Sequence, residues 1–143
     1  MARIVVGIDG SKHALAALRW ACQEALLRGA ALELVAAWSI PSATYDIASS
    51  EVVQAMQDSA TEAIDAGRAE VRAAFPALEM TSEVFQGQAA RILVERAKGA
   101  DLLVVGSRGL GDFKALLLGS VSQECSHHSP VPIVIVREAE PAA

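Results

Sequence analysis

The sequence has few aromatic residues and no concentration of positive charge. Aromatic side chains make up 4% of its 143 residues while 52% of the residues are apolar, so the core is expected to consist of Ala, Val, Leu and Ile. The net charge is −5, and the Lys and Arg residues form no cluster. Proteins that follow a phosphate backbone need such a cluster, so nucleic acid is not an expected partner.

Long apolar segments and a disulfide framework are also missing. No run of 18 apolar residues occurs, which argues against a membrane span, and residues 1–10 lack the pattern of a signal peptide. We therefore expect a cytoplasmic protein. The two cysteines, Cys22 and Cys125, each fall on the apolar side of a predicted helix, so we expect free, buried thiols.

Several patterns of well-known enzymes are absent. Gly10-Ser11-Lys12 has the wrong order for a P-loop, and no G-x-G-x-x-G follows the first predicted strand. There is no G-x-S-x-G elbow, and no pair of Asp, Glu or His residues is placed by sequence to activate water or an acceptor hydroxyl. His127 and His128 have no third ligand at metal-binding spacing, so zinc is not expected.

The apolar periodicity predicts nine alternating elements. The predicted strands are Arg3–Asp9, Leu32–Trp38, Leu78–Phe85, Leu102–Val105 and Val131–Val136, and the predicted helices are Lys12–Arg28, Glu51–Ala74, Gln88–Lys98 and Ser120–His128. This alternation predicts an α/β fold: one domain, residues 1–138, with an open five-stranded parallel sheet of order 3-2-1-4-5 and helices on both faces, as in Rossmann-like proteins. Residues 139–143 are expected to form a frayed tail.

This strand order predicts where a ligand binds. Strands one and four lie side by side where the order reverses, and open parallel sheets bind ligands beyond the carboxyl ends of such strands. The residues at those ends are Asp9 and Gly106. The location follows from the order of the elements alone.

The segment after the fourth predicted strand is suited to phosphate. Gly106 and Gly109 permit close approach of the backbone to an anion, and Gly119 and Ser120 begin a helix whose first N–H groups have no internal partner. The hydroxyls of Ser120 and Ser122 add donors. As an alternative, residues 120–123 also read as a capping box, in which Ser120 only starts a helix.

Asp9 also has two interpretations. Its place at a strand end favours contact with a ligand. Its carboxylate could instead cap the first helix or brace the turn that precedes it.

The spacing G-x2-G-x9-G-S resembles that of the universal stress proteins, in their nucleotide-binding subgroup. The resemblance covers essentially the whole chain and includes Val6–Ser11, Val104–Gly109, Leu117–Ser122 and Val131–Arg137. It implies that ATP is the ligand and that Mg²⁺ bridges its phosphate oxygens, because Mg²⁺ favours phosphate plus few protein ligands.

The resemblance also implies roles for individual residues on the base and ribose side. Ile8 would line the purine pocket, and Asp9 would contact the ribose hydroxyls or a phosphate-bound metal. Ala37 would meet the adenine edge through its backbone. Val105 and Gly106 would lie beneath the ribose and the first phosphate.

On the phosphate side, the resemblance implies that Arg108 and Gly109 face the phosphates. The same phosphates would be cradled by backbone N–H groups and hydroxyls of Gly119, Ser120, Val121 and Ser122. Asp112 departs from the family pattern, in which small or neutral residues are commoner at this place in the loop. A carboxylate that points inward would repel the outer phosphates, with Lys114 as an offset, whereas a loop carboxylate that faces water would not.

We interpret the chain as a nucleotide-dependent switch with little or no turnover, in which ATP orders the loop Gly109–Gly119. The alternatives are a slow ATPase or phosphotransferase that uses Asp9 and Mg²⁺, a binder of AMP or cyclic AMP, and a ligand-free scaffold. The apolar strand Val131–Val136 lies at a sheet edge in this order, so we expect a homodimer joined through it. The sequence does not indicate a protein partner or a particular stress.

Overall fold

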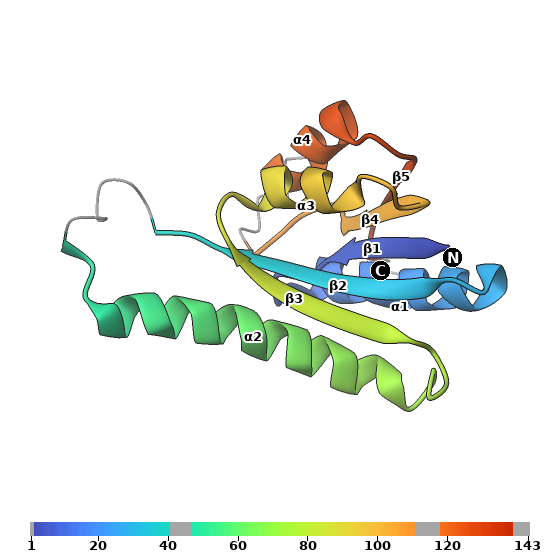
Figure 1. Ribbon diagram of the computed structural model, residues 1–143, viewed down its shortest axis with the longest axis horizontal. Coiled ribbons are helices and arrows are strands. Elements are labelled where there is room, and N and C mark those ends of the chain that lie inside the picture. Colours follow the sequence, from blue (N-terminus) through green and yellow to red (C-terminus); the bar gives the residue numbers. More distant parts are fainter. Residues whose placement is uncertain (1, 41–46, 111–117, 139–143) are drawn as a thin grey trace, which may run out of the picture.

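The computed structural model describes residues 2–40, 47–110 and 118–138. Nine elements alternate along the chain (Figure 1). The strands are β1 (Arg3–Gly7), β2 (Ala31–Trp38), β3 (Met80–Gln86), β4 (Leu102–Gly106) and β5 (Ile133–Val136), and the helices are α1 (Lys12–Arg28), α2 (Ser50–Arg72), α3 (Ala89–Ala97) and α4 (Ser120–His128). Asp112, Lys114 and the expected tail, residues 139–143, lie outside the described residues.

The five strands form one parallel sheet in the order β3-β2-β1-β4-β5, which confirms the predicted fold class. The central strand β1 pairs with β2 through Arg3 opposite Ala31, and with β4 through Ile4 opposite Leu102. The order reverses between β1 and β4, so the carboxyl ends of these two strands meet at the switch point. The half-polar β3 is an edge strand, as its alternating sequence predicts.

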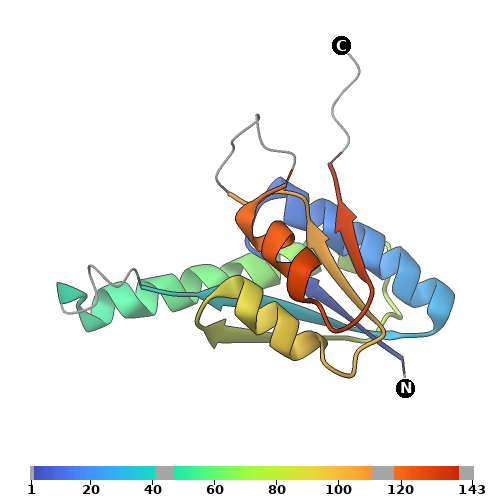
Figure 2. The same ribbon diagram turned by 90° about the horizontal axis from the view of Figure 1, so that it is seen from above.

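Helices cover both faces of the sheet (Figure 2). Helices α1 and α2 pack on one face, in a core that includes Leu18, Ile64 and Leu34. Helix α3 packs on the other face with α4, where Leu93 and Cys125 join Leu103 in a second core. Strands β1 and β4 are buried on both faces, which explains their continuous apolar sequences.

The ends of several elements differ from prediction by one or two residues. Strand β3 begins at Met80 rather than Leu78, because the N–H of Leu78 donates to the carbonyl of Phe75 in a turn (3.3 Å). Strand β5 begins at Ile133 rather than Val131, whose N–H is taken by the Ser129 hydroxyl (3.3 Å). These turn contacts are specific to the folded chain and have no signature in apolar periodicity.

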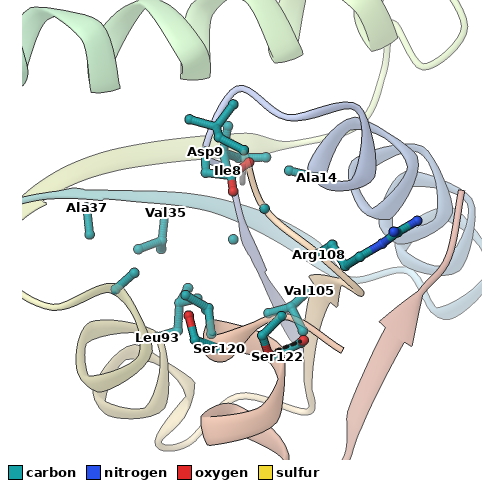
Figure 3. A pocket seen from close by; sticks show the side chains of 17 residues that line it. Ile8, Asp9, Ala14, Val35, Ala37, Leu93, Val105, Arg108, Ser120 and Ser122 are labelled. Atoms are coloured by element: carbon teal, nitrogen blue, oxygen red, sulfur yellow. Dashed lines mark hydrogen bonds between the residues drawn. The ribbon is translucent and has the colours of Figure 1, made fainter. Parts of the chain in front are cut away.

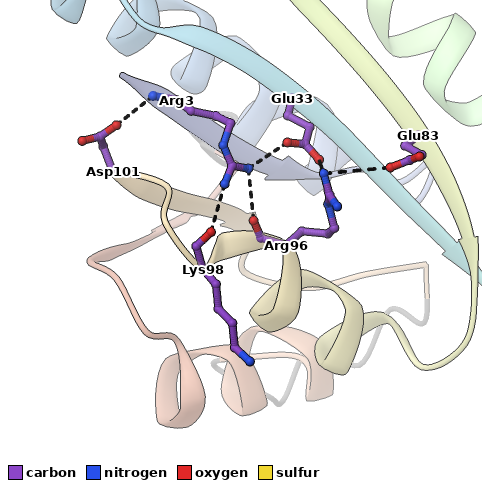
Figure 4. Close-up of polar contacts among 6 residues, drawn as sticks. All are labelled: Arg3, Glu33, Glu83, Arg96, Lys98 and Asp101. Atoms are coloured by element: carbon purple, nitrogen blue, oxygen red, sulfur yellow. Dashed lines mark hydrogen bonds and ion pairs between the residues drawn. The ribbon is translucent and has the colours of Figure 1, made fainter. Parts of the chain in front are cut away.

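A polar cluster fixes the amino edge of the sheet, opposite the switch point (Figure 4). Glu33 of β2 is buried, and its carboxylate accepts hydrogen bonds from Arg3 (2.8 Å) and Arg96 (2.9 Å). Arg3 also donates to the carbonyls of Arg96 and Lys98 at the end of α3. The cluster therefore ties α3 to β1 and β2, and α3 in turn reaches the carboxyl edge.

Among residues 2–40, 47–110 and 118–138, no helix combines the length and apolar character needed to cross a bilayer.

Candidate functional site

The turn after β1 is braced by its own side chains. The carboxylate of Asp9 accepts a hydrogen bond from the N–H of Ser11 (2.9 Å), and Gly10 adopts a positive φ of 84°. The Ser11 hydroxyl accepts from the N–H of Ala14 (3.1 Å) and is the N-cap of α1. Bracing of the turn by Asp9 is therefore confirmed, whereas capping of α1 by Asp9 is wrong because Ser11 occupies that position.

The glycine that ends β4 is required by packing. A Cβ on Gly106 would lie 2.7 Å from the carbonyl carbon and the carbonyl oxygen of His13, in the first turn of α1. Sequence reasoning gave a different purpose to Gly106, namely close approach to an anion. In the structure, the absence of a side chain at Gly106 lets the start of α1 pack directly against the end of β4. The two elements therefore lie close together at the switch point.

Gly109 and Gly119 lie where the turn after β1 and the β4–α4 connection come close to each other. A Cβ on Gly109 would lie 2.9 Å from Oδ2 of Asp9, so glycine leaves room for that carboxylate. The N–H of Gly119 donates to the carbonyl of Ser107 (2.6 Å), which brings the two ends of the β4–α4 connection side by side. Ser107 is itself buried, and its N–H donates to Val136 of β5 (2.8 Å).

Helix α4 begins without a side-chain cap. Its N-cap is Gly119, in an extended conformation, and no side chain in the described part of the chain caps the helix. The capping-box alternative is therefore wrong: Ser120 is the first helical residue and is exposed. The first N–H groups of α4 have no partner within the helix, and the helix dipole adds partial positive charge to them.

The hydroxyl of Ser122 is already engaged. Ser122 is buried, and its Oγ donates to the carbonyls of Ser107 (2.9 Å) and Gly119 (3.0 Å). A hydroxyl has one proton, so both bonds share it, and none remains for a phosphate oxygen. Ser122 therefore holds the start of α4 in place rather than supplying the free donor that the sequence suggested.

These turns surround a pocket of about 420 Å³ at the carboxyl edge of the sheet (Figure 3). All eleven predicted site residues line it: Ile8, Asp9, Ala37, Val105, Gly106, Arg108, Gly109, Gly119, Ser120, Val121 and Ser122. Volumes of 300–1,000 Å³ are usual for small-molecule sites. The structure thus brings the predicted residues together at one edge of the sheet.

The side chain of Arg108 runs away from Ser120 and Ser122 (Figure 3). The resemblance implied that Arg108 faces the phosphates. The guanidinium of Arg108 is therefore directed away from the start of α4. Arg108 lines the pocket as part of the segment between Gly106 and Gly109.

Sequence reasoning missed six further lining residues, namely Gly7, Ala14, Val35, Ala89, Leu93 and Leu110. Val35 and Leu93 have the apolar spacing of core residues, and they are largely buried, so periodicity alone does not separate them from the core. Helix α3 has no motif that points to a ligand. The element order is the one signal available, because it places the start of α3 at the same edge as Asp9 and Gly106.

The pocket has chemically different walls. Val35 and Ala37 of β2 form an apolar wall, and the start of α4, beside Leu93 of α3, supplies N–H donors (Figure 3). Asp9, just beyond the end of β1, lies across the pocket from Ser120 (Figure 3). No group of three or more His, Cys, Asp or Glu residues within the described ranges could hold a metal ion.

The two thiols lie within the cores. Cys22 on α1 and Cys125 on α4 are fully buried, and neither lines the pocket. Burial raises the pKa of each thiol to about 11, because the thiolate is poorly solvated there. They are packing residues, as the sequence predicts.

A model of the universal stress protein family matches residues 1–137. The chain belongs to the universal stress protein family. A universal stress protein of Mycolicibacterium smegmatis is 32% identical over 98% of this chain and 49% of its own length. Universal stress protein Rv2624c of Mycobacterium tuberculosis is 31% identical over 96% of this chain and 48% of its own length. The chain therefore spans about half the length of these two curated relatives.

Solved structures of the family share the fold. A universal stress protein in complex with cyclic AMP is 30% identical, with a TM-score of 0.70 over 96% of this chain and 98% of that one. Universal stress protein UspA from Lactobacillus plantarum is 23% identical, with a TM-score of 0.79 over 95% and 97% of the two chains. The second likeness shows the fold alone.

Proposed function

We propose that this universal stress protein binds an adenine nucleotide in the switch-point pocket and acts as a nucleotide-dependent switch with little or no turnover. The observation that carries the proposal is the uncapped start of α4, which opens onto a pocket with an apolar wall formed by Val35 and Ala37. A helix start of this kind favours an anion, and an apolar slot favours a flat base. A nucleotide has these two parts joined by a ribose.

The lining residues suit one orientation of the nucleotide. The base would lie against Val35, Ala37 and Leu93, and the first phosphate would accept hydrogen bonds from the N–H groups of Ser120 and Val121. The N–H of Gly119 is already engaged with the carbonyl of Ser107. Asp9 would accept hydrogen bonds from the ribose hydroxyls through Oδ2. Its Oδ1 is already engaged with Ser11.

The relatives support adenine as the base. The structure that is 30% identical was solved with cyclic AMP, and a universal stress protein from Archaeoglobus fulgidus, 22% identical, was solved with dAMP. These ligands share an adenine and one phosphate group. For this chain we propose ATP, because the motif that follows β4 resembles that of the nucleotide-binding subgroup.

Magnesium would be held chiefly by the phosphates of ATP. Asp9 carries the only carboxylate among the residues described as lining the pocket, and Gly109 leaves open space beside its Oδ2. This fits an ion that keeps several waters and takes one protein carboxylate at most. Bound Mg²⁺ would neutralise charge on the outer phosphates.

Calorimetric titration of nucleotide-stripped protein with Mg-ATP, AMP, cyclic AMP and adenosine tests the proposal. We expect about one nucleotide per chain, with ATP tightest and adenosine weakest, because adenosine has no group for the start of α4. Tighter binding of AMP or cyclic AMP would keep the pocket and contradict ATP as the ligand. No heat with any of the four, with an unchanged melting temperature, would contradict the proposal as a whole.

A substitution that adds one negative charge at the start of α4 distinguishes an effect on phosphate binding from an effect on folding. Ser120→Asp places a carboxylate at the start of α4, where the helix dipole tolerates or favours it, but where it repels phosphate. We expect the affinity for ATP to fall at least about tenfold while adenosine binds as before. Ser126→Asp adds the same charge to an exposed position of α4 outside the pocket lining, so it should leave ATP binding unchanged.

We also propose that two copies of the chain pair through β5. All four residues of β5 are apolar and only half buried, and β4 is the one described strand that pairs with it. An apolar edge with free backbone groups favours pairing with another strand. The second strand would be supplied by the same element of another copy.

A further inference from the structure

A second hollow, of about 340 Å³, adjoins the nucleotide pocket. It lies beyond the carboxyl ends of β1 and β2 on the side of α2. Four residues line both spaces: Ile8, Asp9, Ala37 and Leu110. The nucleotide pocket lies on the side of α3 and α4, so these residues form the boundary between the two hollows.

The hollow forms because α2 and β2 both continue past the core of the sheet. Figure 1 shows the first half of α2 extending beyond the sheet, alongside the end of β2. Small side chains on this part of α2, those of Ser59, Ala60 and Ala63, leave the space open. The half-buried side chains of Trp38 and Met56 contribute its large apolar surfaces.

The composition of the hollow indicates the chemistry of an occupant. An indole and a thioether are favourable surfaces for a flat or flexible apolar group, and aromatic groups gain further from stacking or sulfur contacts. Asp9 is the one charged residue in the described lining. The hollow is therefore suited to an uncharged apolar group that enters from the neighbourhood of Asp9.

We propose that this hollow is a subsite for an apolar substituent carried on the ribose of an adenine nucleotide, so that the two spaces together accept an O-acylated or O-aroylated nucleotide. The proposal rests on the proposed function, which places the ribose at Asp9. Because Asp9 lines both hollows, a group on a ribose oxygen beside it has a short path past Ile8 and Ala37 to Trp38.

A fluorescent nucleotide that carries a methylanthraniloyl ester on its ribose, mant-AMP, is a suitable probe. Its aromatic ester has the size and character that the hollow would accept. We expect mant-AMP to bind about tenfold more tightly than AMP, because the ester loses contact with water on binding. Energy transfer from tryptophan to the ester should fall more in Trp38→Phe than in Trp20→Phe, since Trp38 lines the hollow.

Filling the hollow tests its position. Ala60→Leu should remove the tenfold advantage of mant-AMP and leave AMP binding unchanged. Ala69→Leu makes the same change at an exposed position of α2 and should leave both affinities as they are. Met56→Ala removes part of the wall without adding bulk, so it should lower the affinity for mant-AMP and not that for AMP. It provides a second test if the larger Ala60→Leu variant does not fold.

The outcomes separate the two proposals. If neither nucleotide binds, the proposed function fails. If AMP binds and mant-AMP binds no more tightly, or if Ala60→Leu lowers both affinities equally, the subsite is refuted while the nucleotide pocket stands. A large fall in melting temperature for Ala60→Leu, with the mant-AMP advantage retained, would show that the chain itself fills the hollow and would also refute the subsite.

Discussion

Gly106 shows how the site depends on a side chain that is missing. Its position lies in contact with the backbone of His13, and any Cβ there would be 2.7 Å from carbonyl atoms that belong to the first turn of α1. The same carbonyl lies within a helix and has little freedom to move. Substitution of this glycine is therefore expected to cost more stability than substitution of a glycine that faces a flexible side chain.

Gly106→Ala is expected to lower the free energy of unfolding by about 1–3 kcal/mol, because α1 must shift away from β4 to admit the methyl group. Urea denaturation measures the effect. Gly7→Ala is the matched control: its Cβ would be 2.9 Å from the end of the Leu93 side chain, which can rotate away, so its loss should be smaller. Equal losses in the two variants would contradict the role of the His13 backbone.

The buried thiols predict a dependence of stability on alkaline pH. The pKa of Cys22 and of Cys125 is raised from 9.0 to about 11 in the folded chain. As pH rises, the unfolded chain therefore loses these protons before the folded chain does. The contribution of the thiols to the free energy of unfolding is fully present below pH 9 and falls as pH rises toward 11. The loss by pH 11 is at most about 3 kcal/mol for each thiol. Urea denaturation at several pH values should show a shallower decline in Cys22→Ala, and the same slope as the parent chain would contradict this account.

At the scale of elements, α3 links the two edges of the sheet. Its end is held at the amino edge by Arg3 and the buried Glu33, and its start contributes Ala89 to the pocket at the carboxyl edge. The polar cluster of Figure 4 is thus a structural anchor that lies far along the helix from the site.

Glu33→Gln should lower the free energy of unfolding by about 1–3 kcal/mol, because Arg3 and Arg96 lose a charged acceptor that is buried between them. The affinity for nucleotide should not change. Glu24→Gln, which breaks the exposed pair with Arg28, is expected to cost less than about 0.5 kcal/mol. A drop in nucleotide affinity for Glu33→Gln, with stability retained, would show that the cluster acts on the site instead.

At the scale of the whole molecule, the proposed dimer depends on the edge of β5 that faces away from β4. The carbonyl of Pro132 accepts from Leu103 of β4 and that of Val136 from Ser107, just after β4. This pattern directs the backbone groups of the intervening odd-numbered residues to the open side. Ile133 and Ile135 therefore direct their N–H and carbonyl groups away from β4, where the proposed partner strand would pair with them.

Ile135→Pro removes one outward N–H and leaves the bonds to β4 intact, so it should weaken the proposed dimer while the monomer stays folded. Sedimentation at micromolar concentration checks this. Ile135→Val keeps the N–H and should stay dimeric. A monomeric parent chain, or a fully dimeric Ile135→Pro variant, would exclude pairing through this edge.

The fold and the position of the pocket were predictable because both depend on the order of the elements. Alternation of strands and helices determines the strand order, and the strand order places Asp9 next to Gly106. The contributions of Val35 and Leu93 were not predictable, since an apolar residue at a pocket wall and one in a core have the same spacing. The engagement of Ser122 by Ser107 was hidden as well, because it depends on a contact across the β4–α4 connection.

That contact has a consequence for how the chain tolerates change. Ser107 receives the N–H of Gly119 and the hydroxyl of Ser122, so the two ends of the intervening segment are fastened to each other by the fold itself. Doubling the length of a loop between fixed ends costs only about 0.6 kcal/mol in closure entropy. We therefore expect a peptide tag inserted between Leu110 and Leu118 to leave the sheet and the start of α4 as they are.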